Sequence, residues 1–430
     1  MFGRWSETFR DMNGNDRAIV TFASVTHALV HTYELSIPIL VVIWLSEFSV
    51  STALMGTVVA VGYALFGIGA LPGGVLADRF GSRTVVLACL AGMGLSFFAL
   101  SFAVGVRTIA VALALWGAVA SVYHPAGLSL ISTGVEKRGT GLAYHGMAGN
   151  VGIAVGPLVT ALLLLAVDWR TATRLLVVPA VVAIVYAATA EFDGTAAVST
   201  DGGTDADADD ELSLSGFIAD SRVLFTAGFA MAMLVVMMNG LFYRGTLTFL
   251  PDMLGGFLAD VAGSVRIVDP ESPVADEFDL SSYVYSGLLM VGIAGQFVGG
   301  KVSDRVPPTL GLAATFAALC VVAVAFVPAA EAGLATLLAA SAVLGFLLFA
   351  LQPLYQATIA EYSPPDDRGL SYGYTYLASF GIGATGAAIA GFLLSAVGTD
   401  GTFLALAVFP AIGAVLALSL ARSWVDGTGV

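Results

Sequence analysis

Long apolar segments recur along almost the whole chain, and they constrain its fold more than any other feature. Only 11% of the 430 residues are charged, whereas soluble domains carry about 25%. In lipid a segment must satisfy its own backbone hydrogen bonds, and a helix needs about 20 residues to span. The sequence predicts an all-α membrane protein with twelve transmembrane helices, at 18–46, 52–77, 84–105, 108–133, 140–167, 172–190, 222–250, 281–302, 309–328, 332–360, 369–397 and 401–421.

The distribution of charge predicts the orientation of the chain in the membrane. The net charge is −14, and the acidic residues gather in two polar segments, 191–221 and 252–280, which argues against a nucleic-acid partner. With the N-terminus inside, twelve Lys and Arg residues lie on the cytoplasmic side and four lie outside. We therefore expect a multi-pass protein of the cell membrane with both termini in the cytoplasm.

The first predicted helix carries ionisable residues in a segment otherwise suited to lipid. His27, His31 and Glu34 are spaced four and then three apart, so they fall within about 60° of one another on one helix face. Charge in hydrocarbon is costly, so this face should point to the bundle interior or to a water-filled cavity. We expect the three residues to carry a coupling proton. The alternative is a structural hydrogen-bond cluster or a misplaced helix boundary.

The cysteines and histidines predict neither a metal site nor a cofactor. Cys89 and Cys320 both lie in apolar segments, and the four histidines are spread over three predicted helices without a H-E-x-x-H pattern. The sequence also lacks a nucleophile paired with a base and a phosphate-binding loop. We therefore do not expect an enzyme.

Two segments of the first half recur in the second half. GGVLADRFGSR at 73–83 returns as GGKVSDRVPPT at 299–309. YHPAGLSLISTGVEKRG at 123–139 is echoed by LQPLYQATIAEYSPPDDRG at 351–369. The order of the matches is the same in both halves, which indicates an internal duplication.

The duplication sets the domain organisation. When the two halves are aligned, Pro38 corresponds to Pro251. This alignment places His31 at the same depth in the membrane as Arg244, to within a turn or two of helix. The segment between the halves is rich in Gly and Asp, so it cannot bury apolar surface and should be disordered. We expect two six-helix bundles of parallel orientation joined by an acidic cytoplasmic linker, with boundaries at 1–190, 191–221 and 222–430.

The first repeat resembles the loop motif G-x-L-A-D-R-x-G-R-K of the major facilitator superfamily of secondary transporters, although Ser82 replaces one closing basic residue. The resemblance extends over essentially the whole chain and implies the fold of that superfamily. Asp78 at a helix end can pair with cations and latch the two halves, which rock against each other in alternating access. The alternative is a loop that only sets topology. The predicted gating residues are Gly74, Asp78, Arg79, Gly81, Arg83, Asp304 and Arg305.

Four further segments resemble the fosmidomycin-resistance branch of drug exporters: HALVHTYE, YHPAG, RGTGLAYHGMAGNVGIAVGPL and FYRGTLTFLP. This branch implies proton-driven export of a small amphiphilic or anionic compound. An arginine typical of the superfamily is replaced by Leu113, and the glycine pair that follows GIAVGP in antiporters is missing. Small residues at Gly149, Gly152 and Gly156, with Pro157, predict a closely packed helix face.

Polar residues in other predicted helices are candidates to line a cavity between the halves. Arg244 could hold an anionic substrate with its fork-shaped guanidinium, or it could neutralise Glu34 as a structural ion pair. Both alternatives remain open at this stage. The predicted cavity residues are His124, Asn150, Asn239, Arg244, Gln352, Gln356 and Tyr374.

Together these features predict a secondary active transporter, most readily a proton-coupled exporter of a drug or metabolite. Its expected partners are a small-molecule substrate, protons and the lipid bilayer, and we expect a monomer. A proton-coupled importer of a carboxylate or sugar-like solute fits the same residues. A membrane sensor or scaffold that has lost transport is a more remote alternative, because the latch motif and the polar cavity both serve alternating access.

Overall fold

Helices account for nearly all of the protein in the computed structural model, which describes residues 9–197, 214–262, 278–363 and 368–425. The first half contains α2 (Gly14–Glu47), α3 (Thr52–Ile68), α4 (Ala70–Phe80), α5 (Ser82–Leu100), α6 (Val106–Ala120), α7 (Tyr123–Gly134), α8 (Arg138–Leu164) and α9 (Trp169–Thr189). The second half contains α10 (Leu214–Leu224), α11 (Ala227–Ala262), α12 (Leu280–Ser303), α13 (Pro308–Glu331), α14 (Leu334–Glu361), α15 (Arg368–Tyr376), the π-helix η2 (Leu377–Ile382), α16 (Thr385–Leu406) and α17 (Val408–Val425).

The lengths of the helices agree with a membrane protein. Within the described ranges, ten helical runs are long and apolar enough to span a bilayer, or eleven if α3 and α4 form one span bent by 47°. The last run, Leu370–Arg422, is interrupted at Gly398, where φ is 69°. The sequence predicts a boundary between two spans at this point. Dividing the last run there, and counting α3 with α4 as one span, is consistent with the predicted twelve transmembrane helices. The all-α prediction is confirmed.

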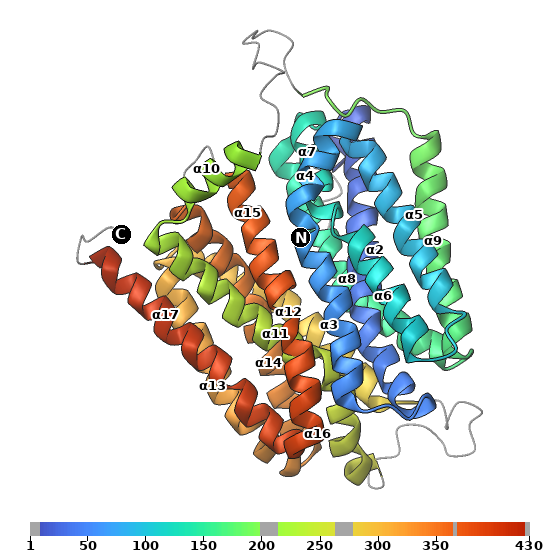
Figure 1. The fold of residues 1–430 in the computed structure, drawn as a ribbon, viewed down its shortest axis with the longest axis vertical. Coiled ribbons are helices and arrows are strands. Elements are labelled where there is room, and N and C mark those ends of the chain that lie inside the picture. The colour runs from blue at the N-terminus through green and yellow to red at the C-terminus, as the bar shows by residue number, and fades with distance from the viewer. Residues whose placement is uncertain (1–8, 198–213, 263–277, 364–367, 426–430) are drawn as a thin grey trace.

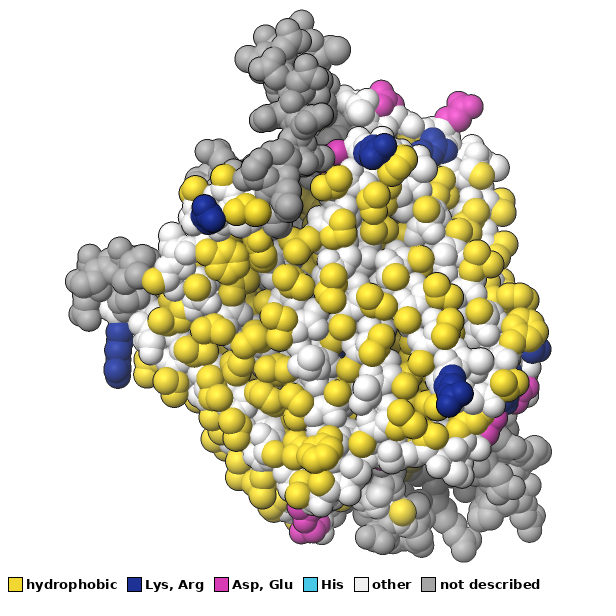
Figure 2. Space-filling model, in the orientation of Figure 1, with side chains coloured by type: hydrophobic (Ala, Val, Ile, Leu, Met, Phe, Trp, Pro, Cys, Tyr) yellow, Lys and Arg dark blue, Asp and Glu magenta, His cyan; other side chains and the backbone are white. Residues whose placement is uncertain are grey.

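The surface also suits lipid. Figure 2 shows a broad, largely hydrophobic middle, with most of the charged side chains near the upper and lower ends of the view. Large apolar side chains such as Leu95, Val182 and Val415 are more than half exposed. Apolar exposure on this scale is unfavourable in water, but it is satisfied by contact with acyl chains.

The helices form two bundles side by side, which confirms the predicted architecture (Figure 1). The bundles meet where α3 lies against α16 and η2. Thr52 donates a hydrogen bond from Oγ1 to the carbonyl of Gly391 over 2.8 Å. A Cβ atom on Gly67 would lie 2.0 Å from the backbone nitrogen of Gly381, so only glycine permits this approach.

About half of each acidic segment, 191–221 and 252–280, lies outside the residues that the structure describes. Of the linker 191–221, residues 198–213 are not described, and its last part belongs to α10 rather than to a disordered tether. Of the segment 252–280, residues 263–277 lie outside the described ranges.

The stripe of small residues in α8 packs against α2. A Cβ atom on Gly152 would lie 2.1 Å from the carbonyl oxygen of Ala28, and one on Gly156 would lie 2.6 Å from Cα of Thr32. Pro157 follows the last of these glycines and is buried within α8. This contact brings the polar residues of α8 up to those of α2.

Candidate functional site

All four histidines of the chain converge near the boundary between the two bundles. Each is buried, with 8% or less of its surface exposed. His27 and His31 come from α2, His124 from α7 and His145 from α8. The ring centroids of His27 and His145 are 4.0 Å apart in a stacked pair, and His124 meets His27 edge-on at 5.2 Å.

Hydrogen bonds link His27, His31 and Glu34 of α2 into a continuous series. Nδ1 of His27 lies 2.8 Å from the carbonyl oxygen of His145. Nε2 of His27 lies 3.1 Å from Nε2 of His31. Nδ1 of His31 lies 2.5 Å from Oε2 of Glu34. The predicted common face of His27, His31 and Glu34 is therefore a continuous hydrogen-bonded path.

The number of hydrogens in this path decides its protonation. Both ends are acceptors, the carbonyl of His145 and the carboxylate of Glu34, and three hydrogen bonds lie between them. Each bond needs one hydrogen, whereas two neutral imidazoles supply only two. One additional proton completes the path, so the observed geometry fits a protonated state of the His27–His31–Glu34 unit.

Glu34 also ties the two bundles together. Its Oε1 accepts a hydrogen bond from Nη2 of Arg244 on α11, and the two side chains are only 1% and 2% exposed. Tyr63 donates from its hydroxyl to the backbone carbonyl of Glu34 over 3.1 Å. The guanidinium carbon of Arg244 stands 3.9 Å from the ring centroid of Tyr63, which adds a cation–π contact.

A cavity of about 460 Å³ lies against the histidines. The first half contributes imidazoles and an amide to its wall, and the second half contributes amides and phenols. No carboxylate is among the described residues that line it. The lining residues are His27, His31, His124, Leu128, Leu142, His145, Gly146, Gly149, Asn150, Ile153, Gln296, Gln352, Tyr355, Gln356, Tyr372, Tyr376 and Phe380.

Comparison with known families agrees with this architecture. The model of the Major Facilitator Superfamily matches residues 21–374 and 253–426, two overlapping ranges that cover most of the chain. The chain belongs to this superfamily. Membership makes the protein a multi-pass membrane transporter of small molecules and not an enzyme. A comparison with curated proteins gives no match.

Solved structures of transporters share the fold. A bacterial homologue of the human lysosomal transporter Spinster, inward-facing and unoccupied, has a TM-score of 0.76 and 15% identity over 96% of this chain and 98% of that chain. A mutant of the nucleoside transporter NupG has a TM-score of 0.71 and 13% identity, covering 94% and 99%. A mutant of the peptide transporter POT, in complex with sulfate, has a TM-score of 0.68 and 16% identity, covering 95% and 94%.

Four of the seven predicted cavity residues of this transporter line the cavity: His124, Asn150, Gln352 and Gln356. Arg244 does not, because its guanidinium is taken up by Glu34 and Tyr63. The ion-pair alternative from the sequence is therefore the arrangement observed. Asn239 is buried in α11, with 5% exposed, and is also absent from the cavity wall.

Tyr374 faces away from the cavity, contrary to the sequence prediction. Its hydroxyl lies 2.8 Å from Oγ of Ser221, and its ring contacts Phe225 edge-on. Tyr372 and Tyr376 line the cavity instead. Residues four apart share a helix face, whereas a residue two positions away points to nearly the opposite side.

The sequence analysis also missed His145, Gln296 and Tyr355 as cavity residues. A signal for His145 is present, because it precedes Gly149 by four residues and therefore shares the face that packs on α2. Gln296 donates from Nε2 to Oε1 of Gln352 over 3.1 Å, which links α12 to α14. Its place in the cavity wall depends on how the helices pack, and no pattern in the neighbouring sequence predicts it.

Of the predicted gating residues, Arg83 is turned into the first bundle. Arg83 donates to the carbonyl oxygens of Ala187 and Ala190, over 2.6 and 2.9 Å, at the end of α9. Gly81 has a φ of 80°, which favours glycine between α4 and α5. Four more of these residues are exposed and form no ion pair with another described residue: Asp78, Arg79, Asp304 and Arg305. Nothing lies within 4 Å of a Cβ atom built on Gly74.

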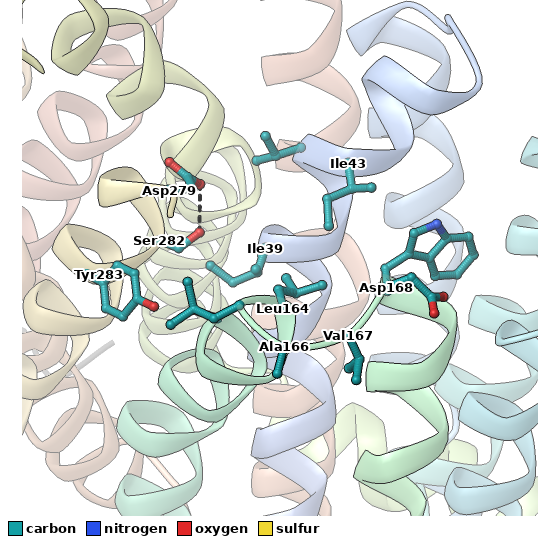
Figure 3. A pocket seen from close by; sticks show the side chains of 13 residues that line it. Ile39, Ile43, Leu164, Ala166, Val167, Asp168, Asp279, Ser282 and Tyr283 are labelled. Atoms are coloured by element: carbon teal, nitrogen blue, oxygen red, sulfur yellow. Dashed lines mark hydrogen bonds between the residues drawn. The ribbon is translucent and has the colours of Figure 1, made fainter. Parts of the chain in front are cut away.

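A second, larger cavity of about 590 Å³ lies beside the C-terminal part of α2, and Figure 3 shows the side chains that line it. Alkyl side chains such as Ile39, Ile43 and Leu164 make up most of its wall. Its carboxylates already have partners, since Asp279 accepts from the hydroxyl of Ser282 over 2.8 Å and Asp168 caps α9. This cavity has few polar groups available to bind a polar solute, so the histidine-lined cavity is the better candidate site.

Proposed function

We propose that this transporter exports a small organic solute in exchange for protons, by alternating access of the histidine-lined cavity. The observation that carries the proposal is the buried path from His27 through His31 to Glu34, whose hydrogen bonds require one extra proton. Both imidazoles also line the cavity, so proton and substrate have access to the same space.

The proposal links the proton to the movement of the bundles through Arg244. With the proton present, all three bonds of the path form and Glu34 holds Arg244 across the boundary. When the proton leaves, two ring nitrogens face each other 3.1 Å apart with one hydrogen too few in the path. The path must then rearrange next to the ion pair that joins the halves, which changes the relative stability of the two conformations.

The cavity wall also favours a class of substrate. It contains imidazoles, amides and phenols without a carboxylate, and Tyr372, Tyr376 and Phe380 supply aromatic faces. We propose an amphiphilic compound that is neutral or anionic. We further propose that the protein acts as a monomer in the cell membrane, with both termini in the cytoplasm and with bundles at 1–190 and 222–430.

Reconstituted vesicles test the proposal. An imposed pH gradient should drive the accumulation of a substrate identified by thermal-shift screening, and a protonophore should abolish it. Transport of substrate against the direction of proton flow supports export. Accumulation that persists when the pH gradient is collapsed contradicts proton coupling, and movement of substrate together with protons indicates the importer.

The gating residues remain part of the proposal. Asp78 is exposed and free of ion pairs with described residues, so any latch through it forms in another conformation. Asp78→Asn should lower the transport rate severalfold and leave substrate affinity unchanged, because it shifts the balance between the two access states. Initial rates and equilibrium binding measure this, with exposed Glu136→Gln as the matched control. A wild-type rate for Asp78→Asn contradicts the gating role.

A further inference from the structure

We propose that His27, His31 and His124 form a binding site for a divalent transition-metal cation in the cavity wall. The sequence gives no hint of this site, because the three residues belong to two different helices and follow no metal motif. In the folded chain one ring nitrogen of each residue lies within 4.8 Å of the others, and all three side chains are buried. The proposal goes beyond transport and does not depend on the transported substrate.

The spacing of the rings fits a shared metal ion. The ring centroids are 4.9 Å apart for His27 and His31, 5.2 Å for His27 and His124, and 5.6 Å for His31 and His124. Metal–nitrogen bonds of about 2.0–2.1 Å in tetrahedral directions place such centroids about 5.2 Å apart. The observed separations bracket this value, so small ring movements complete the site.

The outer hydrogen bonds are those that metal-binding histidines need. Nδ1 of His31 contacts the Glu34 carboxylate, and Nδ1 of His27 contacts the carbonyl of His145. A histidine ligand commonly donates its second N–H to such an acceptor, which fixes the ring and its tautomer. Both rings then direct Nε2 toward each other, 3.1 Å apart, close to the about 3.3 Å between two nitrogens on one tetrahedral ion.

His124 supplies an independent observation. It is 6% exposed, and its ring nitrogens form no hydrogen bond with another described residue. The ring lines the cavity, and its nitrogens are not among the fully buried atoms without a partner, so an ion that enters the cavity can reach them. The neighbouring cavity of about 460 Å³ leaves the fourth position of the ion open to water. Three histidines with an open position suit Zn²⁺, Co²⁺, Ni²⁺ or Cu²⁺ rather than Mg²⁺ or Ca²⁺.

The ion takes the place of the hydrogen between the two Nε2 atoms. Binding therefore releases one proton and leaves both Nδ1–H groups on their acceptors. If the His27–His31 pair carries the coupling proton, as proposed above, a bound cation also blocks transport.

The test measures metal binding by the purified full-length chain in detergent. The protein carries no histidine tag, because a tag would bind the same ions. The four histidines of the chain all lie at this site. Calorimetry with Zn²⁺ should show one equivalent, and Co²⁺ should develop the visible bands of tetrahedral coordination. His124→Gln should weaken Zn²⁺ binding by more than about tenfold. The matched control is His145→Gln, which keeps the backbone carbonyl that His27 contacts and should bind like the wild type.

A second variant keeps the test valid if His124→Gln is misfolded. His124→Cys retains a ligand at this position, so it should bind Co²⁺ and add a thiolate-to-cobalt absorption band that the wild type lacks, although the wild type contains Cys89 and Cys320. The proposal is overturned if the folded wild type binds neither ion, if the cysteine variant shows no such band, or if His145→Gln loses as much affinity as His124→Gln.

Discussion

Glu34→Gln is expected to abolish the accumulation of substrate driven by a pH gradient and to spare substrate exchange at equal pH. The glutamine amide can donate a hydrogen to Nδ1 of His31, so the three bonds of the path form with two neutral imidazoles. The additional proton is then no longer required. Vesicle assays of gradient-driven uptake and of counterflow separate the two activities, because only the first needs a proton to move.

The matched control is Glu47→Gln, the same change on the same helix. Glu47 pairs with Arg170 at 2.8 Å where both side chains are about one-third exposed, and such surface pairs contribute little. This variant should accumulate substrate like the wild type. Since Glu34→Gln deprives Arg244 of its carboxylate, the measurement is repeated in the Glu34→Gln/Arg244→Gln double variant. Normal gradient-driven accumulation in either of the Glu34 variants rules out the Glu34 path as the proton carrier.

The path from His27 through His31 to Glu34 shows how much the periodicity of an α-helix can predict. Spacings of four and three fix His27, His31 and Glu34 on one face, whatever the rest of the fold, and their hydrogen bonds follow that face. The cost of charge in lipid then requires this face to point inward. Apolar segments and the internal duplication similarly predict the two-bundle fold, because span length and backbone satisfaction leave few alternatives.

Contacts between helices were less predictable. The repeat places Arg244 level with His31, yet its guanidinium pairs with Glu34, one turn further along. An alignment of repeats gives depth only to within about a turn, and a guanidinium on a long side chain reaches across that distance. For Tyr374, the face depends on the rotation of the helix about its own axis, which the sequence does not fix. The convergence of four histidines from three helices likewise appears only in the packed structure.

Arg244→Gln should strongly destabilise the transporter, and Glu34→Gln/Arg244→Gln should recover most of the loss. Removing one partner of a buried ion pair leaves an uncompensated charge and costs about 3–5 kcal/mol. Replacing both partners by amides removes both charges and leaves groups that can bond to each other. Thermal unfolding of the purified variants in detergent measures the effect. Arg244→Lys should restore stability only partly, since an ammonium lacks the planar face that contacts Tyr63.

The surface pair again supplies the control, because Glu47→Gln removes the negative charge of the pair, keeps an oxygen that can accept from Trp169, and should change stability by no more than about 1 kcal/mol. The comparison also distinguishes the two sequence alternatives for Arg244. A structural ion pair predicts loss of stability with recovery in the double variant. If Arg244→Gln instead unfolds like the wild type and loses only its affinity for anionic substrates, the guanidinium acts as a substrate clamp, and the link between Glu34 and the movement of the bundles is wrong.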